Sequence, residues 1–181
     1  YVTYEDDVDE YIPIPRVYQI NDVIRYIGEY GDFRGAQDLF IDDNDVLYVA
    51  DTERGRILKM TMEGEVLAEF YGDEKGFNKP KGVYVDQYGD IFVADTENSR
   101  LVHLAPDGSF VEEFGEPRSG ILGEFFTYFP EKLYISPTGF MYVIRGETIM
   151  ILDAYNNFRG YLGQTDVGFS FADWLVNMVA S

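Results

Sequence analysis

Few residues in this chain have the types or spacing that chemistry requires. The 181 residues include one histidine, His103, and no cysteine. A single histidine cannot supply a multi-histidine zinc site, and the lack of cysteine excludes disulfides and thiolate ligands. The serines lack the G-x-S-x-G setting of a hydrolase nucleophile, and the sequence has no glycine-rich phosphate loop. We therefore predict no catalytic and no cofactor-binding residues, and we expect His103 to be structural.

Carboxylates in one turn are the best remaining candidates for chemistry. The segment DDND at 42–45 contains Asp42, Asp43 and Asp45, and Ca²⁺ favours clustered oxygen ligands. The segment lacks the glycine and the distal glutamate of an EF-hand loop. It also aligns with DQYGD at 86–90, which is typical of a hairpin turn. Calcium binding here is the second interpretation, and an ordinary turn is the first.

A further set of polar residues recurs at fixed spacing. It comprises Asp51, Thr52 and Arg56 in VADTERGRILKM, and Asp95, Thr96, Asn98 and Arg100 in VADTENSRLVHL. An Asp and a Thr at the end of a strand can form turn hydrogen bonds. An Arg five residues later can return to the Asp carboxylate as a bidentate partner. We predict that these residues stabilise the fold and do not catalyse.

These motifs belong to an internal repeat that predicts the fold. Residues 31–70 align with 75–114 without a gap, at an offset of 93 − 49 = 44. Apolar residues alternate with period two between turn residues, and the second unit predicts strands near 82–86, 90–95, 100–105 and 109–114. A repeat of about 40–45 residues with four strands is typical of a β-propeller blade. A degenerate third unit has Arg145 at the position of the motif Asp.

The repeat divides the chain into an all-β domain with two flanking segments. We expect an acidic tail at 1–16 and blades within 17–163, followed by a loop and an amphipathic helix at 164–181. The domain comprises an orphan outer strand at 17–27 and blades at about 33–72, 77–115 and 128–163. Closed propellers have about four to eight blades. We therefore expect this partial ring either to belong to a longer propeller or to close as a homodimer.

The second repeat unit is similar to a known family. Residues 77–115, FNKPKGVYVDQYGDIFVADTENSRLVHLAPDGSFVEEFG, resemble an NHL repeat, and residues 33–72 resemble one as well. The resemblance implies a propeller of six blades. The pattern is similar to extracellular NHL-repeat proteins of Gram-positive bacteria, some of which are labelled gluconolactonase-like. Shared fold does not by itself carry an activity.

The amino-acid composition excludes some classes of binding partner. The net charge is −19 with only 14 Lys and Arg, which weighs against nucleic acid and anionic membranes. No apolar run of about 18 residues is present, so we expect no membrane span. The chain begins at Tyr1, as it would after removal of a signal peptide. We therefore expect an extracellular or cell-surface protein.

Aromatic residues are abundant, with 15 Tyr, 14 Phe and 1 Trp. One group lies outside the repeat and is either a partner surface or internal packing: Phe125, Phe126, Tyr128, Phe171 and Trp174. Our first interpretation is a non-catalytic scaffold that binds a protein partner or a neutral or cationic small ligand. The alternatives are a metal-dependent lactonase or hydrolase and a carbohydrate-recognition module at the cell surface.

Overall fold

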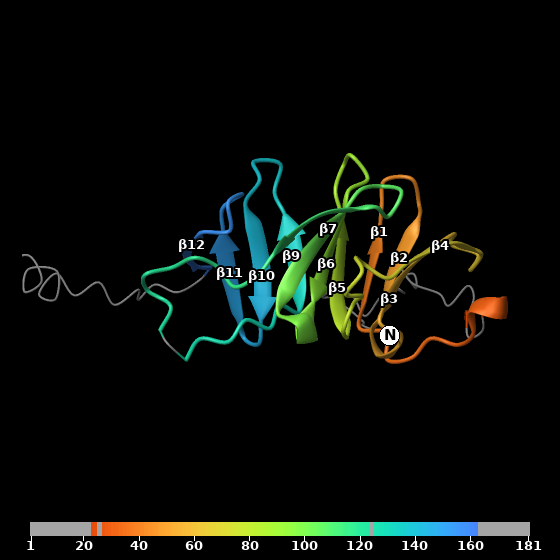
Figure 1. The fold of residues 1–181 in the computed structure, drawn as a ribbon. Coiled ribbons are helices and arrows are strands. Elements are labelled where there is room, and N and C mark those ends of the chain that lie inside the picture. Colours follow the sequence, from red (N-terminus) through yellow and green to blue (C-terminus); the bar gives the residue numbers. More distant parts are fainter. Residues whose placement is uncertain (1–22, 25–26, 124, 163–181) are drawn as a thin grey trace, which may run out of the picture.

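The chain folds into three antiparallel sheets of four strands each (Figure 1). The computed structural model describes residues 23–24, 27–123 and 125–162. The first blade contains β1 (Asp38–Ile41), β2 (Leu47–Asp51), β3 (Arg56–Met60) and β4 (Val66–Phe70). The second contains β5 (Pro80–Val85), β6 (Ile91–Asp95), β7 (Arg100–Leu104) and β8 (Phe110–Phe114). The third contains β9 (Lys132–Ile135), β10 (Met141–Arg145), β11 (Thr148–Leu152) and β12 (Phe158–Tyr161). The three short 3₁₀ helices are η1 (Gly28–Tyr30), η2 (Thr52–Arg54) and η3 (Thr96–Asn98).

The predicted all-β fold with propeller-type, four-stranded blades is confirmed. Within each sheet every strand pairs with its neighbour in sequence, as hairpin connections require. The predicted C-terminal helix, with Phe171 and Trp174, lies outside the described residues, as do the acidic tail and most of the orphan strand at 17–27. No helix in the described ranges has the length and apolar character that crossing a membrane requires.

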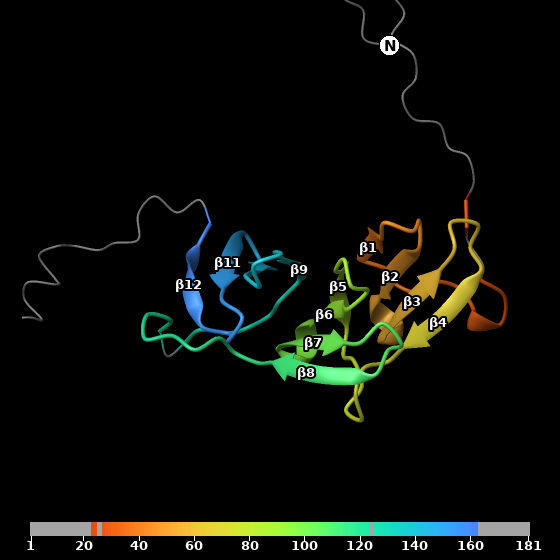
Figure 2. The same cartoon turned by 90° about the horizontal axis from the view of Figure 1, so that it is seen from above.

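The three blades form an arc, so that their first strands face a common concave side. Figure 2 shows β1, β5 and β9 along the inner side and β4 and β8 along the outer side. The turns after these three inner strands all lie at the upper edge in Figure 1. The fold thereby brings three equivalent strands, and the turns that follow them, to one side of the molecule.

The core lies between the blades because alternate residues of a strand point to opposite faces of its sheet. Val83 and Val85 of β5 are buried in one cluster with Tyr48 and Ile57 of the first blade. A second cluster joins Ala94 and Leu101 to the third blade. On the face of the first blade that points away from the second, Leu39 is 62% exposed, whereas its repeat equivalent Val83 is 3% exposed.

The repeated polar motif forms a buried network at the lower end of each good blade. Asp95 is fully buried, and one of its carboxylate oxygens accepts a hydrogen bond from the backbone N–H of Asn78 at 2.7 Å. The other oxygen accepts from Arg100 Nε at 2.7 Å and from Asn98 Nδ2 at 2.8 Å. Thr96 donates to the carbonyl of Pro130, at the entrance to the third blade, at 2.6 Å. The motif therefore ties a turn to its own blade and to the next one.

The predicted bidentate Arg–Asp pair is wrong in detail, because the guanidinium divides its donors among several partners. Arg100 uses only Nε for Asp95, and its terminal nitrogens reach Asp73 at 2.9 Å and Glu113 at 2.5 Å. One guanidinium thus joins the strand end, the outer strand β8 and the segment that enters the blade. Asp73 gains two charge-assisted hydrogen bonds, which hold the pKa of its carboxyl below the ordinary value of 3.8.

The first blade repeats this arrangement with one substitution. Arg56 Nε binds Asp51 at 2.8 Å, and its terminal nitrogens bind Glu69 and the Tyr30 carbonyl. Arg54 stands where the second blade has Asn98, and its Nε donates to the carbonyl of Asp32. That carbonyl is the repeat equivalent of the Gly76 carbonyl, to which the second blade's asparagine donates. Arg54 in the first blade and Asn98 in the second blade therefore donate to equivalent backbone carbonyls.

The third blade lacks the buried Arg–Asp pair, as its sequence predicts. Arg145 occupies the Asp position and donates to the carbonyl of Thr127 at 2.5 Å and to its hydroxyl at 3.2 Å. Its guanidinium also lies 4.7 Å from the centre of the Phe126 ring. The blade's entry segment is therefore held by an arginine directly, without a buried carboxylate.

Replacing Asp95 with alanine will mainly lower stability. The substitution leaves Arg100 buried without one of its carboxylates and removes the acceptor of the Asn78 N–H, so we expect a loss of about 3–5 kcal/mol in the free energy of unfolding. Urea unfolding followed by circular dichroism measures this. The exposed neighbour Glu97 provides the control, because Glu97→Ala should change stability by less than about 0.5 kcal/mol. An unchanged midpoint for Asp95→Ala would contradict the structural role.

Acid will weaken the network through Asp73. Because the folded-state pKa is depressed, the carboxylate contributes stability above its unfolded pKa, and this contribution is lost as the pH falls through the folded pKa. We expect the free energy of unfolding to decline as the pH falls below about 3.8, more steeply for wild type than for Asp73→Asn. Urea unfolding at a series of pH values between neutral and strongly acidic measures the difference. Identical slopes in the two proteins would show that this pair does not couple protonation to folding.

Candidate functional site

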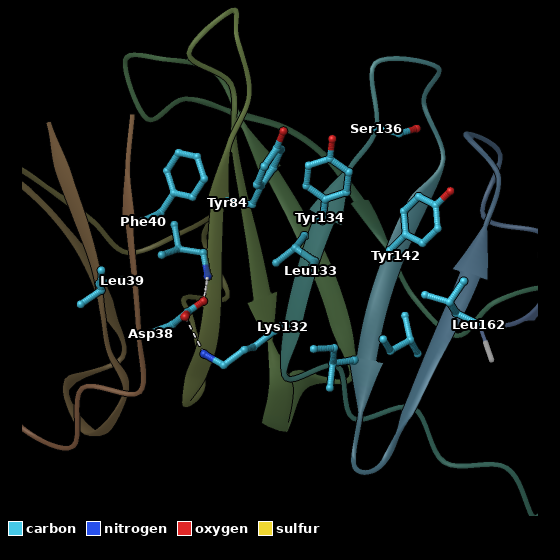
Figure 3. A pocket seen from close by; sticks show the side chains of 13 residues that line it. Asp38, Leu39, Phe40, Tyr84, Lys132, Leu133, Tyr134, Ser136, Tyr142 and Leu162 are labelled. Atoms are coloured by element: carbon cyan, nitrogen blue, oxygen red, sulfur yellow. Dashed lines mark hydrogen bonds and ion pairs between the residues drawn. The ribbon is translucent and has the colours of Figure 1, made fainter. Parts of the chain in front are cut away.

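A groove of about 840 Å³ opens on the concave side of the arc. Its wall is formed by the inner strands β1, β5 and β9, and it continues over the far face of the third blade along β10 and β11 (Figure 3). This volume lies within the range of pockets that hold small molecules or short peptide segments. The sequence predicted no residue of this groove as functional, because its members come from three blades.

Four aromatic side chains form a continuous row along the groove, which we call the aromatic row: Phe40, Tyr84, Tyr134 and Tyr142. Successive ring centres are 5.2, 5.2 and 6.1 Å apart. The first two contacts are edge-to-face, an arrangement that is favourable beyond simple burial, and the third is tilted. The first three residues occupy the same repeat position, at offsets of 44 and 50. The row thus follows from repetition, and the signal that could have found it is an aromatic residue in the same place of each inner strand.

Below the aromatic row an ion pair crosses the second blade. Asp38 accepts hydrogen bonds from Lys132 Nζ at 2.5 Å and from the Val83 backbone N–H at 3.1 Å (Figure 3). Gly82 is the repeat equivalent of both charged residues, and a Cβ there would lie 2.5 Å from the Glu131 carbonyl oxygen. Glycine is therefore required where β5 and β9 approach each other, and the lysine spans the space that it leaves.

Above the aromatic row lie the turns that carry the predicted metal ligands. Asp42 Oδ1 accepts hydrogen bonds from the backbone N–H groups of Asn44 and Val46, both at 2.9 Å. Asp86 does the same for Tyr88 and Asp90 in the second blade. These contacts support the interpretation of 42–45 as an ordinary turn. Among the described residues no three His, Asp or Glu side chains are grouped as metal ligands would be. Calcium binding at Asp42, Asp43 and Asp45 stays a prediction.

The turns place negative charge near the aromatic row. Burial raises the pKa of Tyr84, with further contributions from Tyr134 and from the carboxylates of Asp86 and Asp43. The phenol of Tyr84 is therefore neutral at physiological pH and is available as a hydrogen-bond donor.

His103 lies apart from the groove, on β7. Its ring stacks on Phe92 with centres 4.4 Å apart, and its nitrogens approach Glu112 at 3.3 Å and Asp90 at 3.4 Å. The carboxylates that a general base requires are thus present, although the sequence did not locate them. The described contacts provide no nucleophile beside the ring, so they fit a packed histidine.

The aromatic residues proposed as a partner surface have different environments. Phe125 is 95% exposed, whereas Tyr128 is 2% exposed and belongs to the core cluster between the second and third blades. Burial raises the pKa of Tyr128. Of the two alternatives, a partner surface is therefore wrong for Tyr128 and internal packing is correct, because its ring is buried in the core between the second and third blades. Phe126 is half-buried against Arg145.

Comparison with known proteins agrees with the geometry of the second blade. The family model of the NHL repeat matches residues 77–104, which extend from the entry segment of the blade through β7. None of the curated proteins matches this chain.

Solved structures with similar folds are propeller-type proteins of low sequence identity. A streptogramin B lyase is 17% identical, with a TM-score of 0.52 over 69% of this chain and 39% of its own. The hydrazine synthase of Kuenenia stuttgartiensis is 13% identical, with a TM-score of 0.55 over 80% and 38%. A catalytically inactive virginiamycin B lyase from Staphylococcus aureus with quinupristin is 15% identical, with a TM-score of 0.51 over 68% and 40%.

Identities this low establish similarity of fold alone. The chain aligns with 38–40% of the length of each of these three structures. The family match in the second blade and the three equivalent sheets agree with one another. The chain therefore contains one segment, residues 77–104, that matches the NHL repeat, and its described residues form propeller-type blades.

Proposed function

We propose that this chain is a non-catalytic binding module that holds a segment of a protein partner in the groove on the concave side. The observation that carries the proposal is the aromatic row, which presents rings from all three blades to one open groove. Tyr134 is 47% exposed at the centre of the groove. Partly exposed tyrosines beside a groove are typical anchors of protein interfaces, because they combine a large apolar face with a hydroxyl.

The chemistry of the groove supports binding more than catalysis. Its charged side chains, Asp38 and Lys132, are already paired with each other, and Asp38 also accepts a hydrogen bond from the Val83 N–H of the second blade. Lys132 also donates to the carbonyl of Gln37, directly before β1. Its remaining walls are aromatic and aliphatic, with the hydroxyls of Ser136 and the tyrosines at the upper edge (Figure 3). NHL repeats commonly mediate protein interactions. The similarity to lyases rests on fold alone and gives no support for a reaction here.

Removing one ring of the aromatic row should weaken peptide binding. A displayed library of random decapeptides is panned against the full chain, and the affinity of an enriched peptide is measured by fluorescence anisotropy. We expect Tyr134→Ala to weaken binding about tenfold, as loss of a central aromatic anchor does. Tyr155→Ala is the matched control, because Tyr155 is 78% exposed and does not line the groove, so its effect should stay within about twofold.

Two results would overturn the proposal. One is failure of any peptide to bind, and the other is equal affinity for wild type and Tyr134→Ala when both variants melt at the temperature of wild type. Binding of a neutral glycan on an array, with no peptide enriched, would favour carbohydrate recognition instead.

A further inference from the structure

We infer that the groove is specific for a basic peptide segment, with an arginine or lysine side chain held between the aromatic row and an acidic rim. We define the acidic rim by its residues, Asp42, Asp43, Asp45 and Asp86, and leave out Asp90 because its carboxylate approaches His103 at 3.4 Å. The inference rests on the proposed function, because it names the chemistry of the segment that the groove would bind.

The arrangement of the inner hairpins places the acidic rim beside the aromatic row. The rim lies in the turns β1–β2 and β5–β6, at the edge toward which the Tyr84, Tyr134 and Tyr142 hydroxyls point (Figures 1 and 3). The raised pKa of Tyr84, to which the Asp43 and Asp86 carboxylates contribute, agrees with this proximity. The carboxylates of the acidic rim and the rings of the aromatic row therefore lie at the same opening of the groove.

The negative charge at this opening has no neighbouring cation in the turns themselves. The three turns at 42–46, 86–90 and 136–140 contain no Lys or Arg. Lys132 is the cation that lines the groove, and its charge is matched by Asp38 at 2.5 Å. Asp42 and Asp86 each accept backbone hydrogen bonds through a single oxygen, Oδ1. The charge complementary to this opening is therefore positive.

A guanidinium or ammonium group can contact the aromatic row and the acidic rim at the same time. A cation is attracted to the face of an aromatic ring and also to nearby carboxylates. Arginine suits the site especially well, because its planar group stacks on rings and donates to carboxylates in the same pose. A neutral sugar could stack on the rings and donate hydroxyl hydrogen bonds to the carboxylates, but it would gain no charge–charge attraction from the acidic rim.

The two ends of the groove differ, which predicts the order of residues in the peptide. Carboxylates lie above the first and second blades, whereas the turn of the third blade contains Ser136 and Thr138. At the other end of the third blade's strands, level with Lys132, the groove is lined by Ile144, Ile149 and Leu162. A peptide with basic residues at one end and apolar residues at the other would match both parts.

The test uses three labelled decapeptides and two double variants of the full chain. The first peptide carries two arginines followed by two leucines, and the other two replace the arginines with citrulline or with glutamate. Citrulline keeps the shape of arginine without its charge. The variant Asp43→Asn with Asp86→Asn removes two charges from the acidic rim and keeps the Oδ1 acceptor of Asp86. The matched control, Glu53→Gln with Glu97→Gln, removes two charges from the turns at the opposite edge of the same blades, where both residues are exposed.

We expect wild type to bind the arginine peptide about tenfold more tightly than the citrulline peptide, and the glutamate peptide most weakly. The acidic-rim variant should reduce the preference for arginine to about twofold or less, and the opposite-edge control should retain it. Raising the salt concentration from about 50 to 300 mM should weaken the arginine peptide more than the citrulline peptide, because exposed charges are screened.

The outcomes separate the two proposals. If all three peptides bind equally and Tyr134→Ala weakens each, the groove binds peptides but the inference of a basic ligand is wrong. Equal losses in the acidic-rim variant and in the opposite-edge control would show a general effect of net charge and would also overturn it. If library peptides bind only outside the groove, with Tyr134→Ala unchanged, the proposed function itself is wrong.

Discussion

The structure depends on a carboxylate that is buried at the end of the second strand of a blade. Asp51 and Asp95 are fully buried, and each collects a backbone N–H from the incoming chain and the Nε–H of an arginine. A buried charge is costly unless it is paired and hydrogen-bonded, so the position is satisfied only when the strand end, the entry segment and the arginine are all in place. In the first and second blades this requirement fixes how the blade begins and ties the outer strand to it.

The third blade shows what changes when the carboxylate is absent. Arg145 cannot collect N–H donors, so it donates to Thr127, and Tyr128 is buried in the adjacent core. The turn between β10 and β11 is shorter, so Thr148 pairs with Arg145 where Arg100 pairs with Asp95 in the second blade. The sheet retains its four strands, which indicates that alternating apolar residues are sufficient for the blade and that the polar network orders its entrance.

The strands and their sheet order could be predicted from the sequence because the repeat aligns turn with turn. The expected strands near 82–86 and 100–105 correspond to β5 and β7 within two residues. Alignment of the repeats could not predict the groove. Its ion pair joins Asp38 and Lys132, which are 94 residues apart in the sequence, and the pair depends on Gly82 in the strand that lies between them. The prediction of a bidentate pair between Arg100 and Asp95 was wrong for a similar reason, because the additional partner Asp73 lies 27 residues from Arg100 in the sequence.

The same repetition that builds the blades also explains why the groove is the most distinctive surface of the arc. A residue that recurs at one position of each inner strand is brought into contact with its own equivalents, so Phe40, Tyr84 and Tyr134 form the first three members of the aromatic row. The turns above them vary freely because their backbone needs only a capping Asp or Ser. Their other side chains can therefore determine the charge at the opening without disturbing the blades, and in this chain that charge is negative above two blades of three.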